Sequence, residues 1–176
     1  MIDRRLNGAR VRDGYRALLL RVMLLALAAY LIFTFAFLIT QNHGLGMYPA
    51  MKDGDLCIVF RRQAQHLMGQ EFAADDIVSY RVEGKRYMGR VVAIAGDSVL
   101  MNEGGSLSVN GVGEGGGIMY PTYARGELTY PLTVPQGCVF VLGDHRTDTV
   151  DSRDFGPISL DSVEGKVITI LRRRGL

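Results

Sequence analysis

This chain carries hydroxyl and thiol side chains that could attack a carbonyl carbon, but the sequence places no evident partner beside them to activate one. Hydroxyl and thiol nucleophiles need a base within hydrogen-bonding distance, and the candidates here are Cys57, Thr149 and Ser152. Cys57 lies in an apolar run, which favours a buried structural thiol, and to react it would need His43 or His145 close by. The histidines are too scattered to predict a metal site, and no cofactor is expected.

The densest polar motif is Gly-Asp-His-Arg-Thr-Asp-Thr-Val-Asp-Ser-Arg-Asp-Phe-Gly at residues 143–156. Within it, Asp151 and Arg153 flank Ser152, and their opposite charges predict an ion pair or hydrogen bonds that stabilise the loop. We therefore interpret Ser152 as a structural residue rather than a nucleophile.

Three other short stretches precede this motif. Gly-Met-Tyr-Pro-Ala-Met at residues 46–51 follows a long apolar run, and Lys-Asp-Gly-Asp leads into an apolar segment at 52–59. Residues 87–97 read Tyr-Met-Gly-Arg-Val-Val-Ala-Ile-Ala-Gly-Asp. One Gly-Asp pair would mean little, but the four stretches follow one another in order across most of residues 45–156. Together with the apolar run, they resemble the type I signal peptidase family.

This resemblance implies the site of a serine–lysine dyad, and both positions are glycine here. The family's nucleophilic serine falls at Gly46 and its general-base lysine at Gly89. Of the reacting groups, only the backbone N–H at position 46 remains to stabilise an oxyanion. Removing members of such a unit costs on the order of 10⁶ in rate, so conventional cleavage of signal peptides is not expected. Lys52 and Lys85 lie near these stretches but out of register with the base position.

The resemblance also implies a structural loop beside the missing dyad. Thr149 takes the place of a serine that orients the lysine in the family. The expected loop residues are Asp144, Arg146, Thr149, Asp151, Ser152 and Arg153.

A peptide-binding cleft follows from the same resemblance. Met47, Tyr48 and Pro49 are expected to form one wall, while Met51 is expected in the core. Such clefts hold an extended chain by main-chain hydrogen bonds and alternate side-chain pockets, which need no dyad. Relatives that lack the dyad occur in pilus gene clusters of Gram-positive bacteria. The implied partners are therefore the membrane, extended peptide, pre-protein or pilin segments, and the sortase and pilin machinery.

Three functional hypotheses remain open at this point. The first is an inactive, membrane-anchored accessory protein that binds peptide or pilin segments during secretion or pilus assembly. The second is an active signal peptidase that uses an atypical nucleophile. The third is a structural membrane protein that binds no peptide.

An apolar run at residues 22–39 contains no charged side chain and would span roughly 27 Å as a helix. We predict a single transmembrane anchor at 17–40. Residues 1–21 carry six arginines and two aspartates, so the head at 1–16 is expected in the cytoplasm and residues 41–176 outside. A cleavable signal peptide is an alternative, although residues 40–43 lack a small-x-small site. A buried core helix is a third interpretation, but the run lacks an amphipathic pattern.

The distribution of charge argues against a nucleic-acid partner, because the excess of basic residues lies at the N-terminal end of the chain. From residue 41 onward there are 14 basic and 16 acidic side chains. Cys57 and Cys138 lie in apolar runs, and we interpret them as buried free thiols, with a disulfide as the alternative.

Short apolar runs separated by turn residues predict that residues 41–176 are mainly β. The expected fold is a core of antiparallel strands, closed or packed as sheets, with a loop or small insertion at about 112–136. Residues 86–94 alternate with the period of a strand, and Gly89 shares a face with Val91. The predicted strands are 56–60, 77–81, 86–95, 98–101, 107–109, 139–142 and 163–171.

Overall fold

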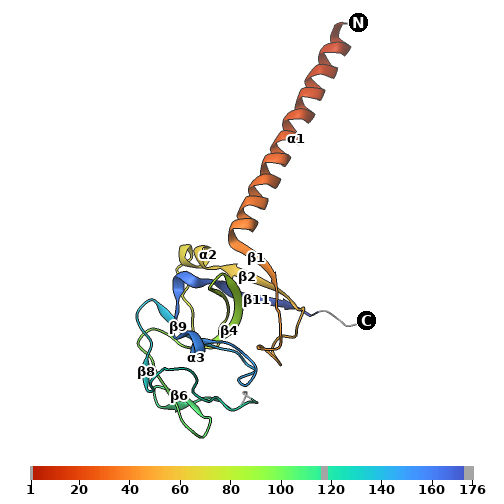
Figure 1. Ribbon diagram of the computed structural model, residues 1–176. Helices are drawn as coiled ribbons and strands as arrows, with labels where there is room; N and C mark the ends of the chain where they lie inside the picture. The colour runs from red at the N-terminus through yellow and green to blue at the C-terminus, as the bar shows by residue number, and fades with distance from the viewer. Residues whose placement is uncertain (1, 116–118, 173–176) are drawn as a thin grey trace. The chain divides into compact units, whose positions relative to one another are not determined.

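The computed structural model describes residues 2–115 and 119–172, with side chains from residue 14 onward. The chain divides into two compact units, Met1–Ala36 and Phe37–Leu176, and each is described by itself (Figure 1).

The first unit is one helix, α1, which runs from Ile2 to Ala36. Its Gly14–Ala36 part has 23 residues and a mean hydropathy of 2.3, which is long and apolar enough to cross a bilayer. Side chains from residue 14 to residue 35 are exposed, so α1 is not a buried core helix. The described part of the predicted head at 1–16 is helical as well.

The anchor predicted at 17–40 is too long at its C-terminal end, because the helix stops at Ala36. Phe37–Gln41 is instead a strand, β1, paired antiparallel with Leu56–Arg61, β2. The rings of Phe37 and Phe60 lie 5.5 Å apart across this pair. An unbroken apolar run looks the same in a helix and in a buried strand, so only the pairing with β2 marks the boundary.

The second unit is mainly β, as predicted, and its strands form two antiparallel sheets. The larger sheet has the order β1-β2-β11-β3-β4-β9-β10, and the smaller one the order β7-β6-β5-β8. Besides β1 and β2, the elements are α2 (Arg62–Leu67), β3 (Ile77–Val82), β4 (Lys85–Ala93), β5 (Ser98–Met101), β6 (Leu107–Val109), β7 (Val112–Gly113), β8 (Leu132–Thr133), β9 (Cys138–Leu142), α3 (Ser152–Phe155), β10 (Ile158–Ser159), η1 (Leu160–Ser162) and β11 (Val163–Leu171).

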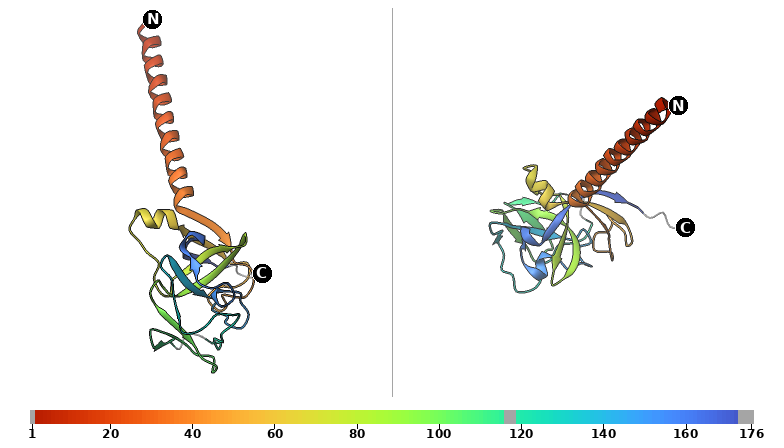
Figure 2. Two further views of the ribbon diagram at one scale, coloured as in Figure 1. Left: turned by 60° about the vertical axis from the view of Figure 1, so that its left-hand side comes forward. Right: turned by 90° about the horizontal axis from the view of Figure 1, so that it is seen from above.

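The two sheets share a core, so the packed form of the predicted β fold is the one observed. Ala93, Phe140 and Leu142 of the larger sheet cluster with Val99 and Leu107 of the smaller one. A second cluster fills the inner face of the larger sheet, whose strands curve around it (Figure 2). A third cluster packs Met47, Met51 and Cys57 together and contains no charged residue.

All seven predicted strands occur, with ends shifted by no more than two residues. The strand predicted at 86–95 ends at Ala93 because the Asp97 carboxylate accepts a 2.8 Å hydrogen bond from the N–H of Ile94 and starts a turn. The two short helices of this unit were missed, since four to six residues are too few to show a helical period.

The segment predicted as an insertion at 112–136 belongs in part to the smaller sheet. It supplies β7, which pairs with β6, and β8, which pairs with β5. Residues 116–118 lie outside the described part of the chain. The insertion is therefore tied into the fold at both ends by strand pairing.

The strand assignment of residues 37–41 can be tested by truncation. A chain that begins at Phe37 should unfold cooperatively, whereas one that begins at Asn42 lacks β1 and leaves an edge of β2 unpaired. We expect its Tm to fall by more than about 2–4 °C, the shift that 1 kcal/mol produces in a domain of this size. Thermal unfolding followed by circular dichroism measures the difference, and equal Tm values would show that β1 adds nothing to this unit.

Candidate functional site

The structure brings the two glycine positions together at the end of β9. Leu142 and Gly143 are consecutive residues there. A Cβ at position 89 would lie 3.2 Å from the carbonyl oxygen of Leu142, and a Cβ at Gly143 would overlap the carbonyl oxygen of Gly46. Gly46 in turn accepts a 3.0 Å hydrogen bond from the N–H of His145. The predicted nucleophile and base positions therefore lie on two sides of one short backbone segment.

Thr149 leaves little space for a side chain at position 46. A Cβ there would lie 3.0 Å from Oγ1 and 3.3 Å from Cβ of Thr149, tighter than ordinary van der Waals contact. Thr149 thus faces Gly46, as its predicted place near the site requires. Because residue 89 is glycine, the Thr149 hydroxyl has no lysine to orient at the predicted base position.

The space at position 89 is filled rather than empty. Gly89 is buried, and a Cβ there would overlap Cγ1 of Val141, a fully buried residue of β9. Glycine inside a strand commonly marks a close approach by another group. Here that group is a β-branched side chain, whose few rotamers give it little freedom to move away.

An ion pair links the strand that carries Gly89 to the loop beside Gly46. Arg90 donates to both carboxylate oxygens of Asp144, at 2.8 and 2.6 Å, and Asp144 is 5% exposed. Burial opposes the charge on Arg90, but the hydrogen bonds to Asp144 outweigh it and raise the pKa of the guanidinium. This bidentate geometry fixes the end of β9 against β4.

Arg146 holds the loop in place from the protein interior. Its side chain is fully buried and donates to the carbonyl oxygen of Gly143 at 2.8 Å and to the hydroxyl of Thr122 at 2.6 Å. It also pairs with Glu114. The loop is therefore bound to the inserted segment between β7 and β8.

Asp151, Ser152 and Arg153 make buried contacts within the loop and with β9, and their structural role stays a prediction. Asp151 caps α3 and pairs with Arg153, with an Nη2–Oδ2 distance of 2.8 Å and both side chains 1% exposed. The hydroxyl of Ser152 is buried and accepts a hydrogen bond from the N–H of Val141 at 2.9 Å. Ser152 thus supports the strand that fills the Gly89 position.

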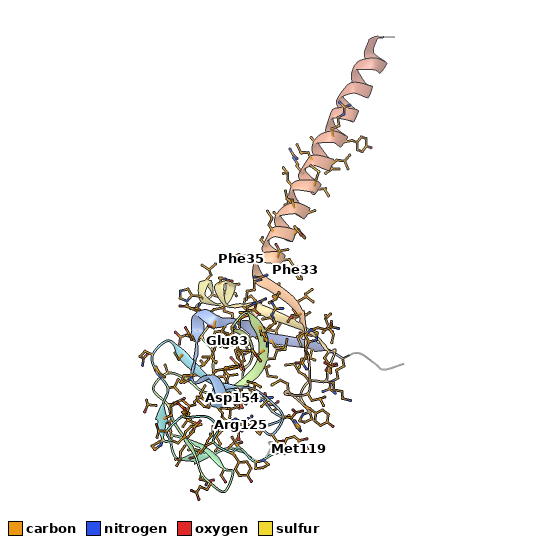
Figure 3. The ribbon with its side chains drawn as sticks, in the orientation of Figure 1. Phe33, Phe35, Glu83, Met119, Arg125 and Asp154 are labelled. Carbon is orange, nitrogen blue, oxygen red and sulfur yellow. The ribbon has the colours of Figure 1, made fainter. Side chains whose placement is uncertain are left out.

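Arg125 is a loop contact that the sequence did not indicate. It donates to the carbonyl oxygens of Thr149, at 2.6 Å, and Arg146, at 2.7 Å. Its guanidinium also lies 3.8 Å from Asp154, and both residues are labelled in Figure 3. Arg125 lies in the segment at 112–136 that was predicted as a loop or small insertion, so nothing in its sequence context marked it as a partner of Thr149.

A groove of about 940 Å³ runs past Gly46. Its walls come from the end of β1 and the chain that follows it, from the first half of β4 and from the loop at 147–150. The lining residues are Thr40, Gln41, Asn42, His43, Gly44, Leu45, Gly46, Met47, Lys85, Arg86, Tyr87, Met88, Thr147, Asp148, Thr149 and Val150.

Two strand edges border this groove. Among the described strands, residues 85–89 of β4 pair with β3 alone, because the pairing with β9 begins at Arg90. β1 is the edge strand at one end of the larger sheet and pairs only with β2. Unpaired strand edges present backbone N–H and C=O groups to a further strand. The groove therefore has the chemistry to take an extended chain.

Arg86 crosses one end of the groove. Its guanidinium donates to both carboxylate oxygens of Glu164 and, at 2.8 Å, to the hydroxyl of Thr40 on β1. Burial opposes ionisation of Glu164, but hydrogen bonds from Arg86, Arg81 and Ser79 outweigh it and lower the pKa of Glu164 to about 2. These contacts join β1, β4 and β11 beneath the groove.

The peptide wall of Met47, Tyr48 and Pro49 stays a prediction, and Met47 is the member that lines the groove while it is also buried. The N–H of Met51 bonds to the carbonyl oxygen of Met47, which places both side chains on one side of a helical turn. Both are buried, with exposures of 1% and 0%, so Met47 joins Met51 in the core. Tyr48 and Pro49 point outward and do not line the groove, and their contact with peptide stays a prediction.

Cys57, another of the candidate nucleophiles, is poorly placed for reaction. Cys57 is fully buried against Met51, and burial, with the nearby charge of Asp55, raises the pKa of its thiol to about 11. Cys57 and Cys138 are free thiols, and Cys138 is half-buried. Among the described residues, no cluster of three or more His, Cys, Asp or Glu side chains could hold a metal ion.

Comparisons with known proteins agree with the four motifs. The pattern of the family described as signal peptidase, peptidase S26, matches residues 15–171. The chain is 30% identical to signal peptidase I of Bacillus caldolyticus over 136 residues, which cover 70% of this chain and 73% of that protein. It is also 30% identical to signal peptidase I T of Bacillus subtilis (strain 168) over 155 residues, which cover 82% and 78% of the two chains.

A crystal structure of a signal peptidase I from Enterococcus faecalis V583 is 30% identical, with a TM-score of 0.46, and the match covers 57% of this chain and 98% of that one. Because the family pattern extends over most of the sequence, this chain belongs to the signal peptidase family, peptidase S26. The resemblance inferred from the four motifs is thereby confirmed at the level of the family.

The packing around Gly89 predicts the effect of adding one methyl group. Gly89→Ala should lower the free energy of unfolding by about 1–3 kcal/mol, the usual cost of overpacking a core, because its Cβ would overlap Val141. In the background of Val141→Ala the added cost should shrink. Denaturant unfolding of the four chains measures the coupling. Gly113→Ala is the matched control, since its Cβ would meet nothing within 4 Å. Equal costs in both backgrounds would contradict the overlap.

The ion cluster under the groove predicts a dependence of stability on acid. The pKa of Glu164 in the folded chain is about 2, below its ordinary value of 4.5. Its stabilisation is therefore complete above pH 4.5 and is lost as the pH falls toward 2. Unfolding free energies measured across this range should decline less in Glu164→Gln than in the unaltered chain. Parallel declines would show that Glu164 carries no such stabilisation.

Proposed function

We propose that this member of the signal peptidase family binds extended peptide segments without cleaving them. The observation that carries the proposal is the paired occupation of both dyad positions: Thr149 crowds Gly46, and Val141 fills the space beside Gly89. A serine–lysine dyad needs a hydroxyl at one position and a neutral amine at the other. Here each position offers backbone only.

The groove supports binding independently of the dyad. Its lining includes residues 85–88 of β4, which among the described strands pair with β3 alone. An added strand draws its affinity from main-chain hydrogen bonds, and glycines at positions 46 and 89 do not remove those. The curated relatives are named as peptidases, which act on peptide chains, and this supports a peptide as the occupant.

In the cell, we propose a single-pass membrane protein whose N-terminus is cytoplasmic and whose β domain lies outside. The Gly14–Ala36 part of α1 supports the anchor, and the six arginines at residues 1–21 support the orientation. The bound segments are pre-proteins or pilins, with an accessory role in secretion or in the assembly of sortase-linked pili. This partner assignment rests on the absent dyad within the otherwise matching motifs.

The competing proposal, an active peptidase with an atypical nucleophile, has one accessible candidate among the three considered. Cys57 and Ser152 are fully buried, and the hydroxyl of Ser152 already accepts a hydrogen bond. Thr149 lines the groove. The chain has no lysine at the base position, so a Thr149 nucleophile would need another group to accept its proton.

The deciding experiment uses the full chain in lipid nanodiscs, with a fluorescent pre-protein segment that contains a small-x-small site. We expect saturable binding by fluorescence anisotropy and an uncut segment by mass spectrometry. Gly46→Ser alone should also leave it uncut, because no base would deprotonate the new hydroxyl. Cleavage by the unaltered chain that Thr149→Ala abolishes would establish the competing proposal. Absence of binding would leave the chain as a structural membrane protein.

A combined variant tests why the site is inert. Gly46→Ser with Gly89→Lys restores both reacting groups, but the new lysine must displace Val141. We expect any recovered cleavage to be greater when Val141→Ala is added. If the added change makes no difference, Val141 does not block the base position.

A further inference from the structure

Beyond binding itself, the groove carries an uneven distribution of charge. Its cationic side chains, Lys85 and Arg86, lie at the start of β4, whereas Asp148 lies on the loop beside Gly46. Asp148 is 69% exposed and 3.8 Å from His145. A chain lying along β4 would therefore meet positive charge at one end and negative charge at the other.

Lys85 differs from the arginines around it because its charge is available. Arg81 and Arg86 both bind Glu164, with Nε–oxygen distances of 2.7 and 2.6 Å, and the guanidinium of Arg86 is also held by Thr40. Lys85 is exposed, and within the described part of the chain no ion pair joins it to an acidic side chain.

The local balance of charge stays positive when the end of the β3–β4 hairpin and Glu164 are counted together. Three cations, Arg81, Lys85 and Arg86, are offset by the single carboxylate of Glu164 and by Glu83. Glu83 lies in the turn between β3 and β4 and is labelled in Figure 3. The cluster keeps one net positive charge, and Lys85 is the group that can present it to a bound chain.

The register of β4 fixes how far this charge lies from the dyad positions. Lys85, Tyr87 and Gly89 share one face of the strand, because side chains alternate. Lys85 therefore lies four residues from Gly89 along β4, about 13 Å at 3.3 Å per residue. An extended chain paired with the free edge of β4 keeps the same spacing, so its alternate residues face these three positions.

We infer that the groove selects extended segments that carry an acidic side chain opposite Lys85, four residues from the residue opposite Gly89. The inference rests on the proposed function and adds the chemistry by which segments are distinguished. An exposed ion pair of this kind contributes little energy, so we expect a preference of about two- to fivefold in Kd. Lys85 is then a specificity-determining residue.

The test uses the full chain in nanodiscs of zwitterionic lipid and labelled alanine–threonine peptides that differ only in the position of one glutamate. Each glutamate peptide is compared with its glutamine counterpart by fluorescence anisotropy. We expect tighter binding of the glutamate peptide at one position, three residues from the peptide residue that crosslinks to a photoreactive side chain at position 88, which lines the groove. The preference should weaken at high salt, because exposed charges are screened.

Variants decide whether Lys85 is responsible. Lys85→Glu should abolish the preference for glutamate and create one for a lysine peptide at the same position. Lys52→Glu makes the same change of charge at an exposed lysine outside the groove lining, so it should keep the original preference. Circular dichroism checks that both variants fold.

The outcomes separate this inference from the proposed function. Peptides that bind with no preference for the glutamate position, or a preference that survives in Lys85→Glu, would overturn the role of Lys85 and leave peptide binding intact. If no peptide binds to the unaltered chain, the proposed function fails, and the charge selection fails with it.

Discussion

The end of β9 packs against its neighbours with no room for a side chain, and the site depends on that close approach. A Cβ at Gly143 would overlap the hydroxyl of Thr149 and the carbonyl oxygen of Gly46. The carbonyl oxygen of Leu142 would lie 3.2 Å from a Cβ at Gly89. Three segments far apart in the sequence therefore meet backbone to backbone. Glycine permits such contacts because it lacks a Cβ. Gly46 and Gly89 therefore suit this close packing.

Buried charge fixes the loop that completes this arrangement. Arg146 and Arg153 are almost fully buried, and each binds a carboxylate as well as backbone carbonyl groups. Removing one partner of a buried ion pair commonly costs 3–5 kcal/mol, because the remaining charge is left unpaired. The loop that holds Thr149 against Gly46 is thus specified by contacts that catalysis does not require. The loop and the two glycine positions therefore depend on different side chains.

The groove is bordered by an unpaired strand edge and carries charged side chains on its surface. The edge of β4 at residues 85–89 is set by where the pairing with β9 begins, and Glu164 holds Arg86 and Arg81 beneath it. A bound chain would contact main-chain groups in the middle of the groove and charged side chains at its ends. In such a site, the register along β4 determines which position of a segment is read by Lys85.

The sequence by itself determined the family and most of the strands, because ordered motifs and alternating residues are local signals, and its placement of the dyad at Gly46 and Gly89 stays a prediction. It also predicted the Asp151–Arg153 pair from two opposite charges that flank Ser152. Only the tertiary structure decided that residues 37–41 leave the helix for β2, that Met47 turns into the core, and that Val141 occupies the space beside Gly89. Each of these depends on a partner distant in sequence. Arg125 was unpredictable for the same reason, since its contacts with Thr149 and Arg146 form only when the inserted segment folds against the loop.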